Sequence, residues 1–415
     1  MKFTRILALV LALVMCCGML ASCGGGDDNT ANKNVLGTNV SASDEFTAGN
    51  KVVKIGCSGP LTGPAAVYGL SVEKAAKLAV SEINAIAAEE LGFTFQFIML
   101  DDKHDPMLVT NNYASLIEQG VQITLGTVTT GPGLEFKEYS HDDNVFVLTP
   151  SASGDDIPEY GNAFQMCFAD SNQGTASAQY FNENYVGKKV GIFYKSDDDY
   201  STGIRNKFKA ALDKSFTVVE ASFKGEESNF ATQVNTLKDC DVIFMPIYYT
   251  PASQFMLAGK NTVKANAIYY GCDGLDGIDA VEGFDISTIP QEISYLSHFN
   301  SGATEGEAGE FIARYNAFEG DATLNQFGAA AYDCVWAIYE ALKFAKAKGT
   351  TFGKTTSSSN YCDILSQVLP HEEFQFHGVT GAQTNGGLNK SDISWQKNGF
   401  VNKEAVKYIV KEANN

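Results

Sequence analysis

The chain has 415 residues and a formal net charge of −19, from 49 acidic and 30 basic side chains. This acidic balance argues against a nucleic-acid partner and against binding of the folded part to an anionic lipid surface. The length that follows residue 50 exceeds what one hydrophobic core usually accommodates, so we expect two lobes.

Residues 1–22 have the pattern of a lipoprotein signal peptide. Lys2 and Arg5 precede an apolar run, 6–19, that is too short to span a bilayer comfortably. The run is followed by Leu20-Ala21-Ser22-Cys23, which resembles the lipobox of bacterial lipoproteins, in which the cysteine is lipidated and becomes the first residue. We therefore expect Cys23 to anchor an extracytoplasmic chain to the cell membrane. An ordinary secretory signal and an uncleaved anchor helix are the alternatives.

Residues 23–50 consist largely of Gly, Asp, Asn, Ser, Thr and Ala, with very few large apolar side chains. Such a segment buries too little surface to order itself, so we expect a flexible polar linker. A linker of this length favours an exposed Gram-positive surface over a periplasm as the location.

Six cysteines follow Cys23, an even number that permits disulfides. None lies in a CxxC pair or at a zinc-ligand spacing, and a domain of this size does not need disulfides. We predict no metal site and no cofactor, and we expect several of these residues to be free, buried thiols. Their pairing stays open for Cys57, Cys167, Cys240, Cys272, Cys334 and Cys362.

Strand-like and helix-like segments alternate from residue 51 onwards. The strand-like segment 52–57 is followed by a Gly/Pro-rich loop and by an apolar stripe at helical spacing, Val72, Ala76, Ala79, Ile83 and Ile86, with Lys74 on the opposite face. After the strand-like 93–100, Asp105-Pro106 predicts a helix N-cap with proline in the first position. Further strands are expected at 121–125, 145–148, 189–194, 216–221, 241–245 and 267–270. This alternation predicts an α/β fold of doubly wound parallel sheets covered on both faces.

In open parallel sheets, ligands bind beyond the carboxyl ends of the strands, so the loops there are the candidate site. Segments 129–132 and 149–153 place hydroxyls and free amides at expected helix starts, which suits a carboxylate but also suits helix capping alone. Asp273 follows an expected strand and either pairs with an ammonium group or belongs to a turn. Three tyrosines are either hydroxyl-bearing walls of a cleft or core residues, namely Tyr200, Tyr248 and Tyr249. Together these groups match a small zwitterion such as an α-amino acid.

Enzyme signatures are lacking in the sequence. It has no GxSxG or HExxH motif, and its five histidines are scattered, which predicts surface or loop positions for them. Segment 349–355 resembles a phosphate-binding loop but is one residue short and follows a helix, so we interpret it as a helix end. We predict that the chain is not an enzyme.

A family resemblance covers nearly all of the chain after the linker. Lys54-Ile55-Gly56, then Gly59-Pro60-Leu61-Thr62-Gly63, Tyr68-Gly69 and 75–85 closely resemble the opening of the branched-chain amino acid binding proteins, the Leu/Ile/Val-type solute-binding components of ABC importers. The match continues through 101–102 with 105–106, then 126–131, 149–153, 248–249, 271–274 and 325–333. The resemblance implies a type I periplasmic-binding-protein fold, with two lobes joined by three hinge crossovers. The lobes are expected at 51–169 plus 295–399 and at 170–294 plus 400–415.

The same resemblance implies roles for individual residues. Thr130, Ser151 and Ser153 would hold the α-carboxylate of the ligand. Asp273 and Tyr200 would hold its α-ammonium, and Tyr68 with either Tyr248 or Tyr249 would wall the side-chain pocket. Asp273 stands where the family commonly has glutamate, and a family disulfide falls on positions that are here His104 and Thr129. A polar stretch, 384–392, also interrupts the usual C-terminal motif.

The sequence therefore predicts a monomeric extracytoplasmic lipoprotein that captures an amino acid, aliphatic or branched, and delivers it to an ABC permease. One alternative is the same fold binding another small polar ligand, such as an amide, urea or an aromatic acid. A second alternative is a ligand sensor with a different membrane partner. An enzyme is the remaining alternative, and it would need a Ser or Cys within reach of a histidine in the cleft.

Overall fold

A computed structural model describes residues 51–353, 356–381 and 392–413, all within one compact unit of the chain. The predicted signal peptide, the lipidation site Cys23, the linker 23–50 and nearly all of the polar stretch 384–392 lie outside these residues. Within the described ranges, no helix has the length and apolar character that crossing a membrane requires.

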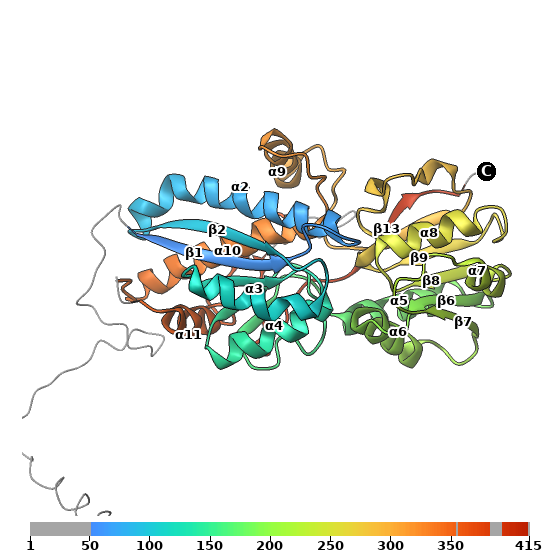
Figure 1. The fold of residues 1–415 in the computed structure, drawn as a ribbon, viewed down its shortest axis with the longest axis horizontal. Helices are drawn as coiled ribbons and strands as arrows, with labels where there is room; N and C mark the ends of the chain where they lie inside the picture. Colours follow the sequence, from blue (N-terminus) through green and yellow to red (C-terminus); the bar gives the residue numbers. More distant parts are fainter. Residues whose placement is uncertain (1–50, 354–355, 382–391, 414–415) are drawn as a thin grey trace, which may run out of the picture. The chain divides into compact units, whose positions relative to one another are not determined.

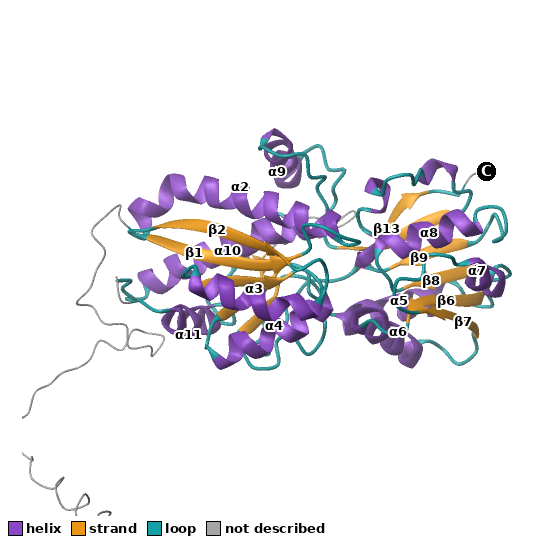
Figure 2. Ribbon diagram, in the orientation of Figure 1, coloured by secondary structure: helices purple, strands orange, loops and turns teal. Residues whose placement is uncertain are grey.

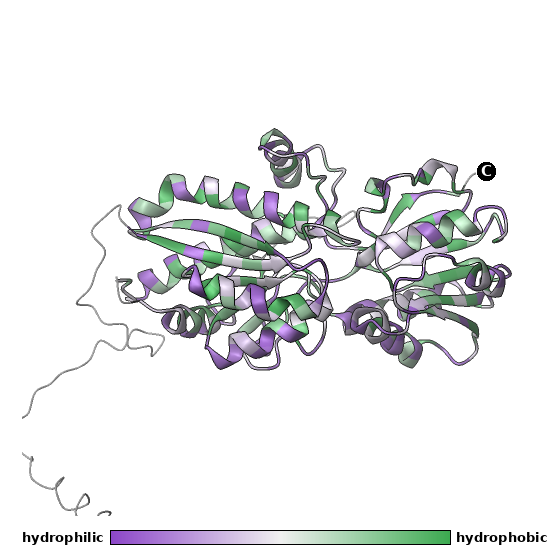
Figure 3. Ribbon diagram, viewed as in Figure 1, coloured by the Kyte–Doolittle hydropathy of each residue, from purple (hydrophilic) through white to green (hydrophobic). Residues whose placement is uncertain are grey.

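The first lobe is built on a five-stranded parallel sheet with the order β2-β1-β3-β4-β5 (Figure 1). Its strands are β1 (Val52–Gly59), β2 (Thr94–Asp101), β3 (Ile123–Thr127), β4 (Phe146–Thr149) and β5 (Ala163–Gln165). Figure 3 shows largely hydrophobic residues along these strands, as expected for a sheet that is covered on both faces.

Helices cover both faces of this sheet (Figure 2). On one face, α2 (Ala66–Glu90) packs on α10 (Gln326–Ala347), which also contacts α11 (Ser358–Val368). On the other face, α3 (Pro106–Glu118) packs on α4 (Thr130–Asp142). A further helix, α9 (Gly306–Ala317), contacts α2, and a two-stranded sheet joins β11 (Phe376–His377) to β12 (Asp392–Ile393).

The second lobe has a six-stranded sheet with the order β13-β10-β9-β8-β6-β7. Its strands are β6 (Lys189–Lys195), β7 (Thr217–Phe223), β8 (Val242–Met245), β9 (Ile268–Gly271), β10 (Glu292–Ser297) and β13 (Val406–Lys411). All are parallel except β13, which runs antiparallel along β10 at the edge. α5 (Asp170–Asn184) packs on α6 (Asp199–Ala211), and α7 (Ala231–Leu237) packs on α8 (Tyr249–Gly259).

The chain passes between the two sheets three times, after β5, after β10 and before β13. The two parallel sheets confirm the predicted α/β class. All of β10 lies in the second sheet, although the lobe boundary predicted between residues 294 and 295 falls inside it. The predicted lobe ranges otherwise stay predictions.

Local sequence signals explain how several elements begin and pack. The Asp105 carboxylate accepts a hydrogen bond from the Met107 amide at 2.9 Å, as the predicted N-cap requires, and Pro106 occupies the first helical position. The predicted apolar stripe on α2 is buried except at Ile86, which is 39% exposed. Lys74, which the same periodicity places on the opposite face, is also buried, because its ammonium donates to the Gly320 carbonyl at 2.6 Å.

All six cysteines that follow the linker are buried free thiols in this structure. Burial raises the pKa of each of them, most strongly for those at the lobe centres, so they stay protonated and unreactive at neutral pH.

Candidate functional site

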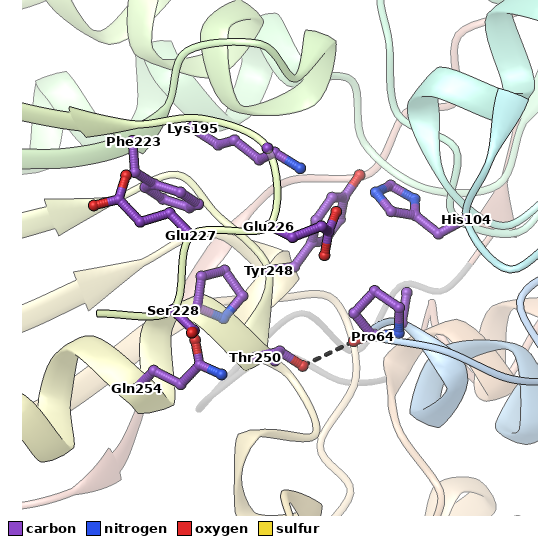
Figure 4. A pocket seen from close by; sticks show the side chains of 13 residues that line it. Pro64, His104, Lys195, Phe223, Glu226, Glu227, Ser228, Tyr248, Thr250 and Gln254 are labelled. Atoms are coloured by element: carbon purple, nitrogen blue, oxygen red, sulfur yellow. Dashed lines mark hydrogen bonds between the residues drawn. The ribbon is translucent and has the colours of Figure 1, made fainter. Parts of the chain in front are cut away.

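Loops at the carboxyl ends of the two sheets contact one another directly. The Tyr68 hydroxyl at the start of α2 donates to the Gly274 carbonyl after β9. The Val67 amide donates to the Tyr249 hydroxyl at 3.2 Å, and the Thr250 hydroxyl donates to the Pro64 carbonyl at 2.8 Å (Figure 4). These three bonds join the first lobe to the second at the edge where parallel sheets bind ligands.

Asp273 occupies the start of a short 3-10 helix, η2 (Asp273–Leu275), directly after β9. It is 1% exposed, and its carboxylate accepts a hydrogen bond from the Tyr200 hydroxyl at 2.6 Å. Its amide donates to the Gln173 side-chain oxygen at 3.0 Å. No described lysine, arginine or histidine forms an ion pair with it, and burial raises the pKa of Asp273 to about 7. A cationic group brought to this carboxylate would stabilise its charged form.

Thr130 lies after β3, at the carboxyl edge of the first sheet. It is the first residue of α4, and its buried hydroxyl has no hydrogen-bond partner among the described residues. A helix N-terminus carries partial positive charge, so this free hydroxyl and the helix start together suit an anionic group. Across the cleft, the side-chain amide nitrogen of the buried Gln173 likewise lacks a partner in the described part of the chain.

Ser151 and Ser153, which were also expected to hold the ligand carboxylate, donate their hydroxyls to other groups of the protein. Ser151 donates to the Val128 carbonyl at 2.6 Å, and Ser153 donates to the buried Asp170 carboxylate at 2.7 Å. The expected helix start at 149–153 is wrong, since the segment after β4 is irregular. Instead, the Thr149 hydroxyl accepts from the amides of residues 151 and 152. Contributions of Ser151 and Ser153 to ligand binding therefore stay predictions.

The four tyrosines expected at the site all lie at this junction of the lobes. Tyr68 contacts Tyr249 edge-on, with ring centroids 4.8 Å apart, and Tyr249 is tied to the backbone of α2. Tyr248 stacks on Tyr200, with ring centroids 4.7 Å apart and planes 13° apart. The geometry therefore favours Tyr248 as a wall of the ligand site and Tyr249 as a contact between the lobes.

A cavity of about 200 Å³ opens beside Tyr248, between the loops of the two lobes (Figure 4). Its walls combine rings and proline with both signs of charge. They include His104 from the first lobe and Lys195, Phe223, Glu226 and Gln254 from the second.

A family model described as "Periplasmic binding protein" matches residues 52–361. The chain belongs to this family.

Two proteins of similar sequence have names that state which amino acids they bind. The Leu/Ile/Val-binding protein BraC3 of Rhizobium johnstonii is 26% identical over 355 residues, covering 80% of this chain and 94% of BraC3. A leucine-, isoleucine-, valine-, threonine- and alanine-binding protein of Pseudomonas aeruginosa is 25% identical over 252 residues, covering 58% of this chain and 66% of that one.

Solved structures of similar fold include the branched-chain amino acid transporter substrate binding protein LivJ of Streptococcus pneumoniae in complex with isoleucine. It is 25% identical, has a TM-score of 0.69 and covers 86% of this chain and 100% of LivJ. A Rhodopseudomonas palustris solute binding protein in complex with benzoate has a TM-score of 0.69 at 16% identity and covers 88% and 94% of the two chains. These likenesses confirm the predicted periplasmic-binding-protein type I fold.

Against that family background, His104 is the main residue of the cleft that the sequence analysis missed. Its Nδ1 atom lies 2.9 Å from the Thr129 hydroxyl, so the two positions of the family disulfide are in contact here through a hydrogen bond. Its Nε2 atom lies 3.9 Å from the Asp198 carboxylate of the second lobe, and its ring meets Tyr248 edge-on at 5.0 Å. Burial lowers the pKa of His104 to about 4, with a smaller effect from the positive charge of Lys195.

The prediction of surface or loop positions for the histidines gave no indication that two of them are buried within loops. His104 is in a loop but largely buried, and His298 is buried immediately after β10. Asp170 and Gln173 were also missed as members of the site, since they lie in the first turn of α5, a helix without a strong apolar stripe.

The described residues contain no group of three or more His, Cys, Asp or Glu side chains arranged to hold a metal ion. The arrangement instead offers hydrogen-bond donors from one lobe and carboxylates from the other. Such a periplasmic binding protein site can hold and enclose a small molecule that carries both charges.

Proposed function

We propose that this chain is an extracytoplasmic lipoprotein that captures an amino acid between its two lobes and delivers it to the permease of an ABC importer. The observation that carries the proposal is the buried Asp273 carboxylate, which has no basic partner among the described side chains. The first lobe supplies a second free group, the unpartnered hydroxyl of Thr130 at the start of α4. An α-ammonium would pair with the first group and an α-carboxylate would accept from the second.

The pairing explains why both lobes are needed. Enclosing a zwitterion removes both of its charges from water, which is costly unless each charge meets a partner. Thr130 belongs to the first lobe and Asp273 to the second, so both partners are supplied only when the lobes come together. Lobe closure around the ligand thereby becomes the signal that a permease reads.

Branched-chain amino acids are the first candidates within this class. The relatives named above bind leucine, isoleucine and valine according to their names, and Phe223 and Tyr248 supply aromatic surface to the cavity. An aromatic acid is a poorer match, because a carboxylate without an ammonium would leave Asp273 buried and unpaired.

The attachment and assembly of the chain are part of the same proposal. Lipidation of Cys23 would tether the lobes to the outer side of a cell membrane through the linker 23–50, with a Gram-positive surface favoured and a monomer expected. A sensor that passes lobe closure to another membrane protein is the second candidate, and permease and ATPase genes beside this one would favour transport over sensing.

The test is a ligand screen on protein that has been unfolded and refolded to remove carried-over solute. A ligand at ~100 times its dissociation constant stabilises the folded state by roughly 2.7 kcal/mol, which is measurable as an increase in melting temperature. We expect increases with one or more of the twenty amino acids, leucine, isoleucine and valine among them. If no amino acid stabilises the refolded protein, amino-acid capture is wrong.

A further inference from the structure

The hydroxyl of Tyr248 is a polar group inside the aromatic part of the cleft. It is buried and has no hydrogen-bond partner among the described residues. The ring itself is fixed, because it stacks on Tyr200 and meets His104 edge-on. A buried hydroxyl without a hydrogen-bond partner is unfavourable, so a ligand group that bonds to it would be favoured.

The groups around this hydroxyl come from both lobes. Lys195 ends β6 and Asp198 caps α6 in the second lobe, whereas His104 follows β2 in the first. In Figure 4, the Tyr248 hydroxyl points towards the ring of His104, and Lys195 reaches the same cavity from the second lobe. We call Tyr248, His104, Lys195 and Asp198 the polar wall of the cleft.

The polar wall is close to electrically balanced. His104 is neutral, because burial lowers its pKa to about 4, and Lys195 contributes one positive charge near the one negative charge of Asp198. Burial raises the pKa of Asp198 to about 6, so Asp198 remains mainly ionised at neutral pH. Glu226 and Glu227, which also line the cavity, are exposed and therefore screened by solvent.

Besides burial, the negative charges of two further carboxylates, Asp273 and Asp170, help to raise the pKa of Tyr248. Both carboxylates already have other roles. Asp273 is the proposed partner of the ammonium, and Asp170 accepts from the Ser153 hydroxyl. They leave the Tyr248 hydroxyl without a direct partner, so a ligand side chain that reaches it would supply one.

Resting on the proposed function, we infer that this site prefers an amino acid with an uncharged, hydrogen-bonding side chain, a hydroxyl or a carboxamide, over its aliphatic isostere. An aliphatic side chain against the polar wall would leave the Tyr248 hydroxyl unpartnered, whereas a hydroxyl or amide would bond to it. A charged side chain on the ligand would add a net charge beside the opposite charges of Lys195 and Asp198, and burying a net charge is costly. The neighbouring cavity of about 200 Å³ gives room for a group as large as a carboxamide.

Threonine and valine provide the sharpest test, because they have nearly the same shape and differ by one hydroxyl. Calorimetric titration of the refolded wild-type protein should give threonine a dissociation constant roughly 5- to 100-fold below that of valine. In Tyr248→Phe this preference should disappear. Tyr269→Phe is the matched control, because the Tyr269 hydroxyl is also buried and unpartnered in the described structure but lies beside Gly259 in the interior of the second lobe.

The outcomes separate this inference from the proposed function. Valine binding as tightly as threonine, or more tightly, in the wild-type protein overturns the inference while leaving amino-acid capture intact. A threonine preference that survives in Tyr248→Phe also overturns it, since the polar wall would then not be its source. Failure of every amino acid to bind would refute both. The wild-type ratio decides the matter even if Tyr248→Phe does not fold.

Discussion

Asp273→Asn removes the negative charge from the proposed ammonium site and changes almost nothing else. Asparagine has the shape of aspartate, and its side-chain oxygen can still accept the hydrogen bond from the Tyr200 hydroxyl. The variant should therefore fold, and its melting temperature without ligand should equal or exceed that of the wild type. Burial raises the pKa of Asp273 to about 7, so the charge itself does not stabilise the unliganded fold.

The expected loss of affinity follows from the burial of the carboxylate. Removing one partner of a buried, hydrogen-bonded charge pair costs about 2–5 kcal/mol of binding free energy, or roughly 30- to 5,000-fold in dissociation constant. Asp273 is 1% exposed and has no other cation among the described residues, so we expect the upper half of this range.

The same carboxylate predicts a pH dependence. Its pKa is raised to about 7 in the unliganded protein, so near neutral pH about half of the molecules hold a proton there. A bound ammonium favours the ionised form and lowers that pKa. Binding should therefore release about half a proton at pH 7, and affinity should fall as the pH decreases below 7.

Titration calorimetry in two buffers of different ionisation enthalpy measures both the affinity and the proton release. Asp273→Asn should lose both, and Asp276→Asn is the control. Asp276 is also buried with a raised pKa, but its carboxylate accepts from the Tyr295 hydroxyl and from the Gln326 amide. Because its charge helps to raise the pKa of Asp273, this control applies to the affinity and not to the proton release. Near-native affinity and unchanged proton release in Asp273→Asn would remove Asp273 from the site.

Two further predictions concern lobe closure and the hinge. Tyr68→Phe deletes the hydroxyl that donates to the Gly274 carbonyl, so we expect ligand affinity to fall roughly 2- to 13-fold through faster dissociation, measurable by stopped flow; unchanged dissociation would contradict this. His298 is buried with both ring nitrogens unpartnered in the described structure, and burial lowers its pKa well below the ordinary value, so it costs stability as the pH falls below about 6.5. His298→Leu should therefore unfold at higher urea concentration, with a larger gain at pH 5 than at pH 7; equal gains at both pH values would show that titration of His298 is not involved.

The fold was predictable because its signals are local and repeated. The strands of both sheets carry short apolar runs, and the N-cap at Asp105 is marked by the proline that follows it. Helix α5 gave no such signal, since its buried face includes Gln173, Gly174 and Ser177 rather than a stripe of large apolar residues. The buried position of Lys74 was unpredictable for another reason, because its partner carbonyl is at Gly320.

The sequence predicts which loops form the site, but it does not predict which side chains of those loops face the ligand. The carboxyl ends of parallel strands meet at one edge, so the loops that carry Thr130 and Asp273 were expected to converge. Nothing local distinguishes Tyr248 from Tyr249, because consecutive residues after a strand point in different directions according to the exact path of the chain. The contact between His104 and Asp198 joins the two lobes, and no short-range pattern encodes it.

Several bonds that hold the lobes together involve the main chain, whereas the choice of ligand depends on side chains. Three of the bonds between them have a main-chain partner, namely the Gly274 carbonyl, the Val67 amide and the Pro64 carbonyl. The bond from the Ser153 hydroxyl to the Asp170 carboxylate instead joins two side chains. Main-chain groups persist through most substitutions, so the geometry of closure can be kept while the side chains that face the ligand change. The solved structures are consistent with this division, because proteins of one fold hold isoleucine in one case and benzoate in another. Ligand choice in this chain should therefore respond to substitutions at Tyr248 and His104 far more than its ability to close does.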